Sequence, residues 1–460
     1  MHNAQAINLF FPAGGRHERA AYDNKPPFYT GDSLNVRGDG SLELRQRGGT
    51  RPGNEKALTT KVGSGNPVRP YFEYIRPTNV KVALASSNGL LYKRSGSTWV
   101  AVGTATVTLR SDRQLSATSI GDKVYIASTT TGAIAEYDPS TDTLGALTAS
   151  SGTVPTNCDQ VGNFRGRLLA GVSSDDLNNW YMSKVLDPTN WLYGDTTATS
   201  AIDGSNSTAG KIAEATRGFV VHGDECVIFF GNTSVWAMRG DPQDGGRIVN
   251  VSREHGGFSH ASWTHDSDGN LWYMSNGDGV YWMPAGCGSK PLSVSRAVMP
   301  ERFLNIDRTT HTVSMAYDTF ARGIHMAVTK NAAGSGSEEW FIDARIVERG
   351  DRLVPMGSFW QEDYPSDHEP FFLYARPDEP SDQSVVLRGC RDGNTRSEDT
   401  QVNDDDGTAI SSHVDIGPFN LGQKGGGEGI LSKFELVTDP ASGDVKVAVK
   451  AGSSAQEAQQ

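Results

Sequence analysis

Pairs of short apolar segments, separated by turn residues, recur along this sequence. Each pair consists of a turn, a run of aliphatic or aromatic residues, a second turn and a second such run. The residues that mark successive pairs are Val82, Tyr125, Leu168, Val227, Trp272, His325 and Leu387. They are separated by 43, 43, 59, 45, 53 and 62 residues. A repeat of about 40–50 residues with strand content is typical of the blades of a β-propeller.

A propeller covers both faces of each of its small sheets, which a single sheet cannot do alone. An isolated four-stranded blade leaves both faces in water, whereas radial stacking covers each face with a neighbouring blade and leaves only short edges. Seven units therefore predict an all-β fold, a β-propeller of about seven blades. The extra length after Leu168, Trp272 and His325 predicts loop insertions on one face of the disc. An array of β-sandwiches is the alternative, with fewer and longer units.

The turn residues support this prediction. Asn88-Gly89 and Asp278-Gly279 have the residue types that adopt positive φ in tight hairpins. The flanking runs are rich in β-branched and aromatic residues, which favour a pleated sheet. Both features indicate consecutive antiparallel strands.

Composition limits the functional classes. The chain has 460 residues, of which 37% are hydrophobic and 21% charged, so it contains enough apolar residues for a large core. Its formal net charge is −12, the wrong sign for a protein that grips nucleic acid through phosphates. An acidic surface that DNA passes without binding is compatible with this charge.

The two ends of the sequence differ from the repeats. Residues 1–60 are predicted to form an N-terminal arm with one hairpin (Leu34 to Leu44), and the arm is a candidate for the strand that closes the ring. Residues 61–400 are the predicted propeller with insertions. Residues 401–460 are the predicted C-terminal β extension and flexible tail, after an acidic loop over residues 397–407. In it, residues 433–437 and 445–449 alternate as a final antiparallel pair.

Two loops have oxygen-rich side chains. Asp266, Asp268 and Asn270 stand at the spacing of a calcium-binding loop, but the bidentate Glu of that pattern is missing. An Asp-Gly turn between two strands explains the same residues. Asp404, Asp405 and Asp406 are better explained as a solvated loop than as a metal cluster.

Other combinations resemble catalytic motifs only in part. Ser259 and His260 imitate a nucleophile elbow, which however ends in Gly and needs a strand-to-helix turn. A glycosidase needs two convergent carboxylates. Glu338 with Glu339, and Glu362 with Asp363, are adjacent in sequence, so each pair points to opposite faces of a strand, and surface charge is the better interpretation.

The histidines and the basic residues are not spaced like the residues of a known metal or catalytic site either. The histidines considered are His222, His255, His260, His265 and His325. Basic residues cluster at Arg16 to Arg19 and at Arg45 to Arg51, where a solvated or subunit-contacting arm is expected and a phosphate-contacting arm is the alternative. The sequence thus predicts no catalytic, cofactor-binding or metal-binding residues, no cofactor, and a protein that is not an enzyme.

Targeting signals and cysteine pairs are also not expected. No window approaches the roughly 18 apolar residues of a membrane span, and the first residues do not form a secretory leader. Cys158, Cys226, Cys287 and Cys390 are far apart in sequence, which predicts reduced thiols rather than a disulfide framework or zinc site. Folding in a cytoplasm without stable membrane insertion is expected.

The order of motifs along residues 30–330 resembles a known family. The relevant segments are Asn35-Val36, Arg51-Pro52-Gly53, residues 165–171 (RGRLLAG), 180–183 (WYMS), 186–191 (LDPTNW), 223–230 (GDECVIFF), 235–238 (VWAM), 255–257 (HGG), 269–275 (GNLWYMS) and 279–281 (GVY). This succession is similar to the tail nozzle proteins of short-tailed bacteriophages, also called packaged-DNA stabilisation or tubular tail proteins. The part after residue 400 has no counterpart in this resemblance.

The resemblance implies a structural virion protein built on a β-propeller. It implies a ring, a homohexamer, below the portal and head–tail adaptor, which retains the packaged genome and conducts it during ejection. Its implied partners are copies of itself, the portal and adaptor, a tail fibre, spike or needle, and double-stranded DNA in transit without sequence-specific binding. Its location would be the virion tail, after assembly in the bacterial host cytoplasm.

A mechanism and two rival functions follow from these expectations. Acidic channel loops would keep DNA unbound and sliding, while a constriction or plug retains it. One rival is a solitary propeller enzyme such as a glycosidase or lyase, with convergent carboxylates or His at a channel mouth. The other is a monomeric propeller interaction platform.

Overall fold

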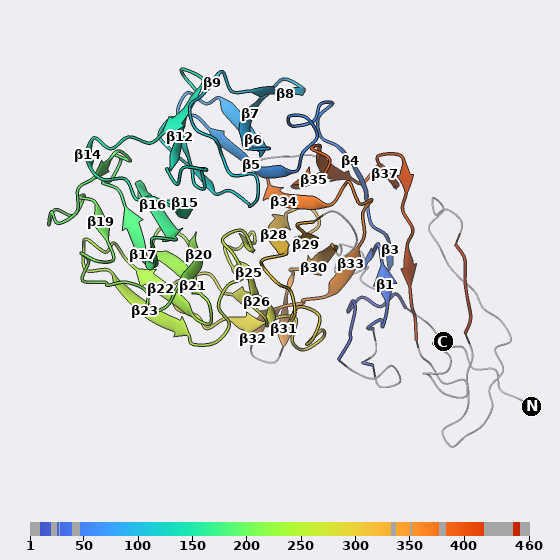
Figure 1. Ribbon diagram of the computed structural model, residues 1–460. Helices are drawn as coiled ribbons and strands as arrows, with labels where there is room; N and C mark the ends of the chain where they lie inside the picture. Colours follow the sequence, from blue (N-terminus) through green and yellow to red (C-terminus); the bar gives the residue numbers. More distant parts are fainter. Residues whose placement is uncertain are drawn as a thin grey trace, which may run out of the picture.

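The strands form a seven-blade β-propeller (Figure 1). This computed structural model describes residues 10–19, 25–26, 28–38, 47–332, 337–349, 352–376, 383–417 and 445–450. Every regular element in those ranges is a β-strand. They contain no helix that is long and apolar enough to cross a membrane.

Each blade is a four-stranded antiparallel sheet. Blades 1 and 2 are β5 (Val68–Ile75), β6 (Lys81–Ser87), β7 (Leu90–Ser95) and β8 (Thr98–Ala101), then β10 (Ala117–Ile120), β11 (Lys123–Ile126), β12 (Ala135–Asp138) and β13 (Thr143–Ala146), with β9 (Thr104–Ala105) parallel to β13. Blades 3 and 4 are β15 (Cys158–Phe164), β16 (Arg167–Ser173), β17 (Asp176–Met182) and β19 (Ile202–Asp203), then β20 (Thr216–Val221), β21 (Cys226–Gly231), β22 (Val235–Arg239) and β23 (Arg247–Ser252). Blade 5 is β24 (Trp263–His265), β25 (Leu271–Ser275), β26 (Gly279–Met283) and β27 (Leu292–Ser293).

Of the last two blades, blade 7 contains a strand from a distant part of the chain. Blade 6 is β28 (His311–Asp318), β29 (Gly323–Lys330), β30 (Glu338–Asp343) and β33 (Phe359–Glu362). Blade 7 is β34 (Pro370–Ala375), β35 (Gln383–Cys390), β36 (Thr395–Asp399) and β4 (Gly53–Lys56). The outer strand β4 comes from the N-terminal arm and pairs Lys56 with Arg396 and Glu55 with Ser397. The arm therefore closes the ring, as the sequence suggested.

The periodicity predicted the blades correctly. All seven marker residues lie in the second strand of their blade, from Val82 in β6 to Leu387 in β35. The turn between β6 and β7 has positive φ at both Asn88 (50°) and Gly89 (80°), which is the geometry expected of an Asn-Gly hairpin. The prediction of a seven-blade propeller is confirmed.

The insertions were predicted only in part. Length added after Leu168 includes β18 (Asn190–Trp191), which pairs with β14 (Ser151–Gly152), and length added after His325 includes the hairpin β31 (Ile346–Arg349) and β32 (Arg352–Pro355). Both follow the third strand of their blade, so they leave the propeller at the same end. The connection 294–310, between blades 5 and 6, lies at the opposite end because it leads into a first strand. The expectation that all insertions share one face is wrong for this segment.

Short strands join the arm to the C-terminal extension. β1 (Ser33–Leu34) pairs with β39 (His413–Val414), β2 (Val36–Gly38) with β3 (Gly48–Thr50), and β37 (Asp404–Asp405) with β38 (Thr408–Ala409). The arm strands β2 and β3 pair with each other, whereas Leu34, the predicted start of the arm hairpin, pairs with His413 instead; Leu44, its predicted end, lies outside the described residues. Figure 1 shows these segments beside blades 6 and 7.

The predicted final strand pair is not seen. Residues 445–450 are exposed and lie in no strand, and residues 433–437 are outside the described residues.

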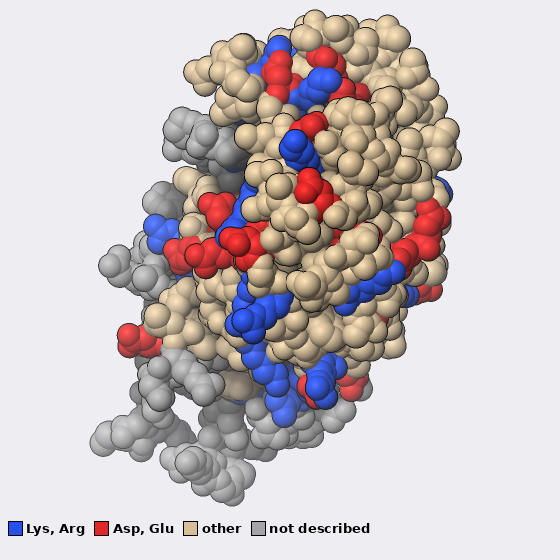
Figure 2. Space-filling view, turned by 90° about the vertical axis from the view of Figure 1, so that its left-hand side faces the viewer, with Lys and Arg blue, Asp and Glu red and all other residues tan. Residues whose placement is uncertain are grey.

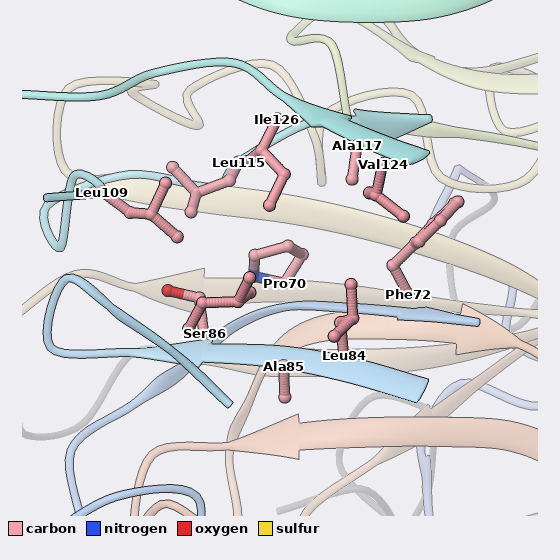
Figure 3. A pocket seen from close by; sticks show the side chains of 11 residues that line it. Pro70, Phe72, Leu84, Ala85, Ser86, Leu109, Leu115, Ala117, Val124 and Ile126 are labelled. Carbon is pink, nitrogen blue, oxygen red and sulfur yellow. The ribbon is translucent and has the colours of Figure 1, made fainter. Parts of the chain in front are cut away.

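Apolar side chains fill six of the seven contacts between blades. Figure 3 shows one of them, where Pro70, Phe72 and Leu84 of blade 1 face Leu115 and Val124 of blade 2 across a narrow apolar gap. The contact of blades 6 and 7 differs, because its apolar cluster contains only Ala316, Ala327, Leu373 and Val386. Charged side chains occupy the remainder of this contact.

Candidate functional site

A buried ionic cluster lies where blades 6 and 7 meet the arm. We use this name for the set Arg37, Asp318, His325, Glu339, Glu362, Arg388 and Glu398, each at most 8% exposed. Arg37 comes from the arm strand β2, and the other six come from blades 6 and 7. The cluster therefore joins three parts of the chain that are far apart in sequence.

Two guanidinium groups organise the cluster. Nη2 of Arg388 lies 2.9 Å from Oε1 of Glu339 and 2.8 Å from Oε1 of Glu398. Arg37 donates from Nη1 to Oε2 of Glu398 at 2.9 Å and from Nη2 to Oε1 at 2.5 Å, and from Nε to Glu362. Glu398 therefore accepts from an arginine of the arm and an arginine of blade 7 at the same time.

The alternation of side chains along β29 and β30 places these charges on one face of blade 6. Ile324 and Met326 point toward blade 5 and join its apolar cluster, whereas His325 between them faces blade 7. In β30, Trp340 joins the blade 5 contact, and Glu339 lies on the other face with Arg388. One face of blade 6 is thus apolar and the other is ionic.

Charges within the cluster stabilise one another. Burial alone would raise the pKa of Glu398, but Arg37, His325 and Arg388 lower it well below its usual range. Burial alone would lower the pKa of His325, but Glu398, Asp318 and Glu339 raise it to about 9. The three surrounding carboxylates therefore favour the protonated form of His325.

The same acids could in principle hold a metal ion. Two overlapping triads, Asp318–His325–Glu398 and His325–Glu339–Glu362, place ligand atoms within 4.8 Å of one another. The guanidinium groups of Arg37 and Arg388 already pair with these carboxylates. The residues fit a charge-compensated network rather than a metal site, because an added cation would have to displace an arginine.

This cluster corrects the sequence interpretation of two carboxylates. Glu339 and Glu362 were expected to be surface charges, but they are 3% and 1% exposed. Their sequence neighbours Glu338 and Asp363 lie outside the cluster, as alternation along a strand requires. Burial was missed because each strand was considered alone, whereas the ionic face exists only between two blades.

A second buried ion pair joins the arm to the C-terminal extension. Nη1 of Arg51 lies 2.8 Å from Oδ1 of Asp405, and Nη2 lies 2.5 Å from Oδ2. The guanidinium also stacks on Tyr364, with Cζ 3.8 Å from the ring centroid, and its Nε donates a hydrogen bond to Oδ1 of Asn35 at 3.0 Å. Arg51 and Asp405 are 1% and 3% exposed.

These contacts correct further predictions. Arg51 is not part of a solvated arm, and Asp405 is not part of a solvated loop. Arg16, from the other basic cluster, forms a hydrogen bond with Gln361 of β33 (2.5 Å) and an ion pair with Glu18 (2.8 Å). The segment expected to be an acidic loop contains strand residues, including Glu398 in β36. In each case a partner distant in sequence removes the charge from solvent.

Side chains close the propeller axis at the end where the first strands begin. Gln114, in the segment before β10, donates from Nε2 to the carbonyl oxygen of Phe371 in blade 7 at 2.8 Å. Its neighbour Arg113 lies 2.8 Å from Asp159 of blade 3. His260 of blade 5 lies close enough to this segment that, besides burial, Asp159, Arg113 and the main chain of Gln114 shift its pKa. Groups from blades 2, 3, 5 and 7 thus meet at the axis.

The calcium-like loop is a turn. The carboxylate of Asp266 accepts hydrogen bonds from the main-chain N–H groups of Asp268 (3.0 Å) and Asn270 (2.9 Å), from Asn270 Nδ2 and from Trp272 Nε1 (3.0 Å). Its oxygens are therefore engaged by N–H donors. This confirms the Asp-Gly turn, with Gly269 at a φ of 76°.

The histidines do not come together in one place. His222 and His265 stack with ring centroids 5.2 Å apart and share a hydrogen bond of 3.0 Å. Burial and His222 lower the pKa of His265 to about 4, so this pair is neutral near pH 7. His255 instead contacts Tyr281 at 2.8 Å. The hydroxyl of Ser262 accepts a hydrogen bond from the N–H of Ser259 and donates one to its carbonyl oxygen, both at 2.9 Å. Ser259 therefore lies in a turn and is not part of an elbow that leads into a helix.

Several members of the cluster were missed in the sequence. Arg37, Asp318, Arg388 and Glu398 were not singled out as candidates. The available signal was a charged residue inside an otherwise uncharged, mostly apolar run. In the segment 386–390, for example, Arg388 stands between Leu387 and Gly389. That signal indicates burial of a charge but does not identify its partner.

Comparisons with known proteins support only the general architecture. The sequence matches no protein-family model and no curated protein. Similar solved structures include the extracellular domain of a protein described as a hybrid two component system from B. thetaiotaomicron, with a TM-score of 0.46 and 11% identity over 75% of this chain. The match covers 40% of that longer chain.

Three further structures of this kind are similar along most of their own length. YCF48 from Cyanidioschyzon merolae has a TM-score of 0.42 and 11% identity, covering 76% of this chain and 99% of that one. The WD40 β-propeller domain of Doa1 has a TM-score of 0.41 and 10% identity, covering 75% and 97%. A 6-phosphogluconolactonase described from Bacteroides uniformis has a TM-score of 0.43 and 13% identity, covering 71% and 89%. At these levels of similarity none of the four carries an argument about function.

Proposed function

We propose that this protein is a structural component of a bacteriophage tail, which forms a nozzle ring below the portal and adaptor. Two observations together carry the proposal. The order of motifs along residues 30–330 resembles that of nozzle proteins, and most of these motifs lie on a seven-blade propeller in which the convergent acids are sealed from solvent. The ring would retain the packaged genome and conduct it during ejection.

The closed axis supports a conduit between copies of the protein. Gln114 is 5% exposed, bonds to Phe371 of blade 7 and lies beside His260 of blade 5, so duplex DNA has no path through a single propeller. In the proposed assembly, DNA passes through the centre of a homohexamer, and each propeller contributes part of the wall. The role of a gate or plug would belong to segments that face this shared centre.

The seam between blades 6 and 7 supports a rigid wall. Arm and C-terminal extension are bound there by two buried ion-pair systems and by the pairing of β1 with β39. A closed ring with its outer strand supplied by the N-terminal arm resists opening, because separation of the arm would expose several charges without partners. Such rigidity suits a component that holds DNA under pressure.

Charge supports passage of DNA without binding. The chain has a net charge of −12, and Figure 2 shows Lys and Arg side chains next to Asp and Glu side chains over one side of the molecule. Over the upper part of this face the two signs are mixed, and Lys and Arg gather only in a strip below, so the face has no basic track along its whole length of the kind that a DNA-binding protein uses. We propose that acidic side chains at the centre of the ring keep DNA sliding.

We further propose that the protein is not an enzyme. The glycosidase alternative needs two carboxylates that a sugar can reach. Glu339 and Glu362 come near one another, but both are buried and paired with arginines, so they cannot serve in that role. A monomeric interaction platform remains the alternative that experiment must distinguish.

Electron microscopy tests the assembly. Negatively stained particles of the protein mixed with portal–adaptor complexes are compared with portal–adaptor complexes alone and with the protein alone. Six-fold rings that cap the complexes only in the mixture are expected. A protein that stays monomeric at all concentrations and leaves the complexes bare would contradict the proposal. Neutralising acidic residues that line the ring should then slow DNA release, and unchanged ejection would refute the electrostatic part.

A further inference from the structure

Arg69 is a buried cation with no acidic partner among the described residues. It lies at the start of β5, at the axial end of blade 1, and is 7% exposed. Its Nε and Nη1 atoms form no hydrogen bond with any described residue. The other deeply buried arginines differ: Arg388 pairs with two glutamates, and Arg167 donates to four main-chain carbonyl groups.

An aromatic ring and a second arginine surround this guanidinium. Cζ of Arg69 lies 4.0 Å from the ring centroid of Phe371, and Cζ of Arg391 lies 4.7 Å from the same centroid. Arg391 is compensated, because Glu369 lies 2.7 Å from its Nη2 and the carbonyl of Lys330 accepts another bond. Arg69 stacks on the ring but has no acid of its own.

The acid that attracts Arg69 already pairs with another arginine. Asp112 attracts Arg69, but its carboxylate forms a bidentate pair with Arg110, at 2.9 Å and 2.7 Å. Burial and Arg391 together lower the pKa of Arg69 to about 10, so Arg69 is still charged at neutral pH. A buried charge with unsatisfied donors is costly, and such a group is normally compensated by an ion or ordered water.

We infer that Arg69 and the adjoining Phe371–Arg391 stack form a binding site for a small oxyanion, a phosphate or carboxylate group, at the axial end of blades 7 and 1. The planar guanidinium offers a fork of donors that matches the two oxygens of either group. The second cation, Arg391, adds attraction for the anion without being released from Glu369. The site belongs to a single copy of the chain, so it does not depend on the proposed tail function.

Thermal unfolding of the full chain with added anions tests the site. Inorganic phosphate and sodium acetate are titrated separately, with sodium chloride at matched ionic strength as the reference. The wild type should show a saturable rise in Tm with phosphate, with acetate or with both, and the comparison shows which oxyanion is preferred. A rise no larger than that in chloride would overturn the inference.

Two variants and a control locate the effect. R69M should lose the saturable rise, and it should be at least as stable as the wild type without the anion, because an uncompensated buried cation is gone. R94Q, which changes the exposed Arg94 of β7, should keep the rise. An equal rise in R69M would overturn the inference. If R69M does not fold, R69K should bind the anion about tenfold more weakly, since it keeps the charge but not the fork. Unchanged affinity in R69K would overturn the inference.

Discussion

Arg388 of blade 7 and Glu339 of blade 6 form an ion pair that is closed to solvent. Nη2 of Arg388 lies 2.9 Å from Oε1 of Glu339, and the two side chains are 0% and 3% exposed. Most buried contacts between blades in this propeller are apolar, and this pair stands where an apolar contact would otherwise be. Because both charges are shielded from water, removal of either residue would leave the other charge buried without this partner.

We expect R388M to lower the free energy of unfolding by about 3–5 kcal/mol, because Glu339 and Glu398 would be left buried without their shared cation. Urea unfolding measures the loss. R110Q is the control: the Arg110–Asp112 pair has side chains 36% and 57% exposed, so its loss should cost at most about 1 kcal/mol. Equal effects of R388M and R110Q would show that the cluster does not stabilise the seam.

Stability should fall as the pH rises from about 6.5 to about 9. The pKa of His325 is raised to about 9 in the folded protein, against 6.5 as its ordinary value, so the folded state binds the proton more tightly. The stabilisation is complete below about pH 6.5 and is lost as the pH rises through 9, by on the order of 3 kcal/mol. Unfolding by urea across this range measures it.

The variant H325Q separates this histidine from other titrating groups. It should be less stable than the wild type at pH 6.5, and its stability should vary much less between pH 6.5 and 9. A variant with the same pH dependence as the wild type would show that another group is responsible.

The substitution R51Q should loosen the C-terminal extension from the arm. It removes the bidentate pair with Asp405 and leaves that carboxylate buried without a cation. Hydrogen exchange should become faster by about tenfold or more at residues 404–415, measured by mass spectrometry. The exposed Arg47 provides the control R47Q, which should exchange like the wild type. Unchanged exchange in R51Q would mean that strand pairing alone holds the extension.

The loop at Asp266 should behave as a structural turn. D266A removes the acceptor for two main-chain N–H groups and two side chains, and it should cost about 2–3 kcal/mol. D268N, at an exposed position of the same turn, should be nearly neutral. Calcium should not raise the Tm of the wild type, and a calcium-dependent rise that D266A abolishes would contradict the turn interpretation.

The sequence alone predicted the repeated unit. Asn-Gly and Asp-Gly turns and β-branched runs act over a few residues, so their effect is visible in the chain itself, as at Asn88 and Gly89. The number of such units then determined the number of blades, because each blade needs a neighbour on both faces.

The tertiary structure decided where the charges go. Arg37, Glu339 and Arg388 carry no spacing that links them, because they meet only after the arm has supplied β4 and after blade 6 has stacked on blade 7. Alternation placed Glu339 and Glu338 on opposite faces, but it could not say that the face of Glu339 is covered. Burial is a property of the assembled ring, and the free energy of a charge depends on what surrounds it there rather than on its neighbours in sequence.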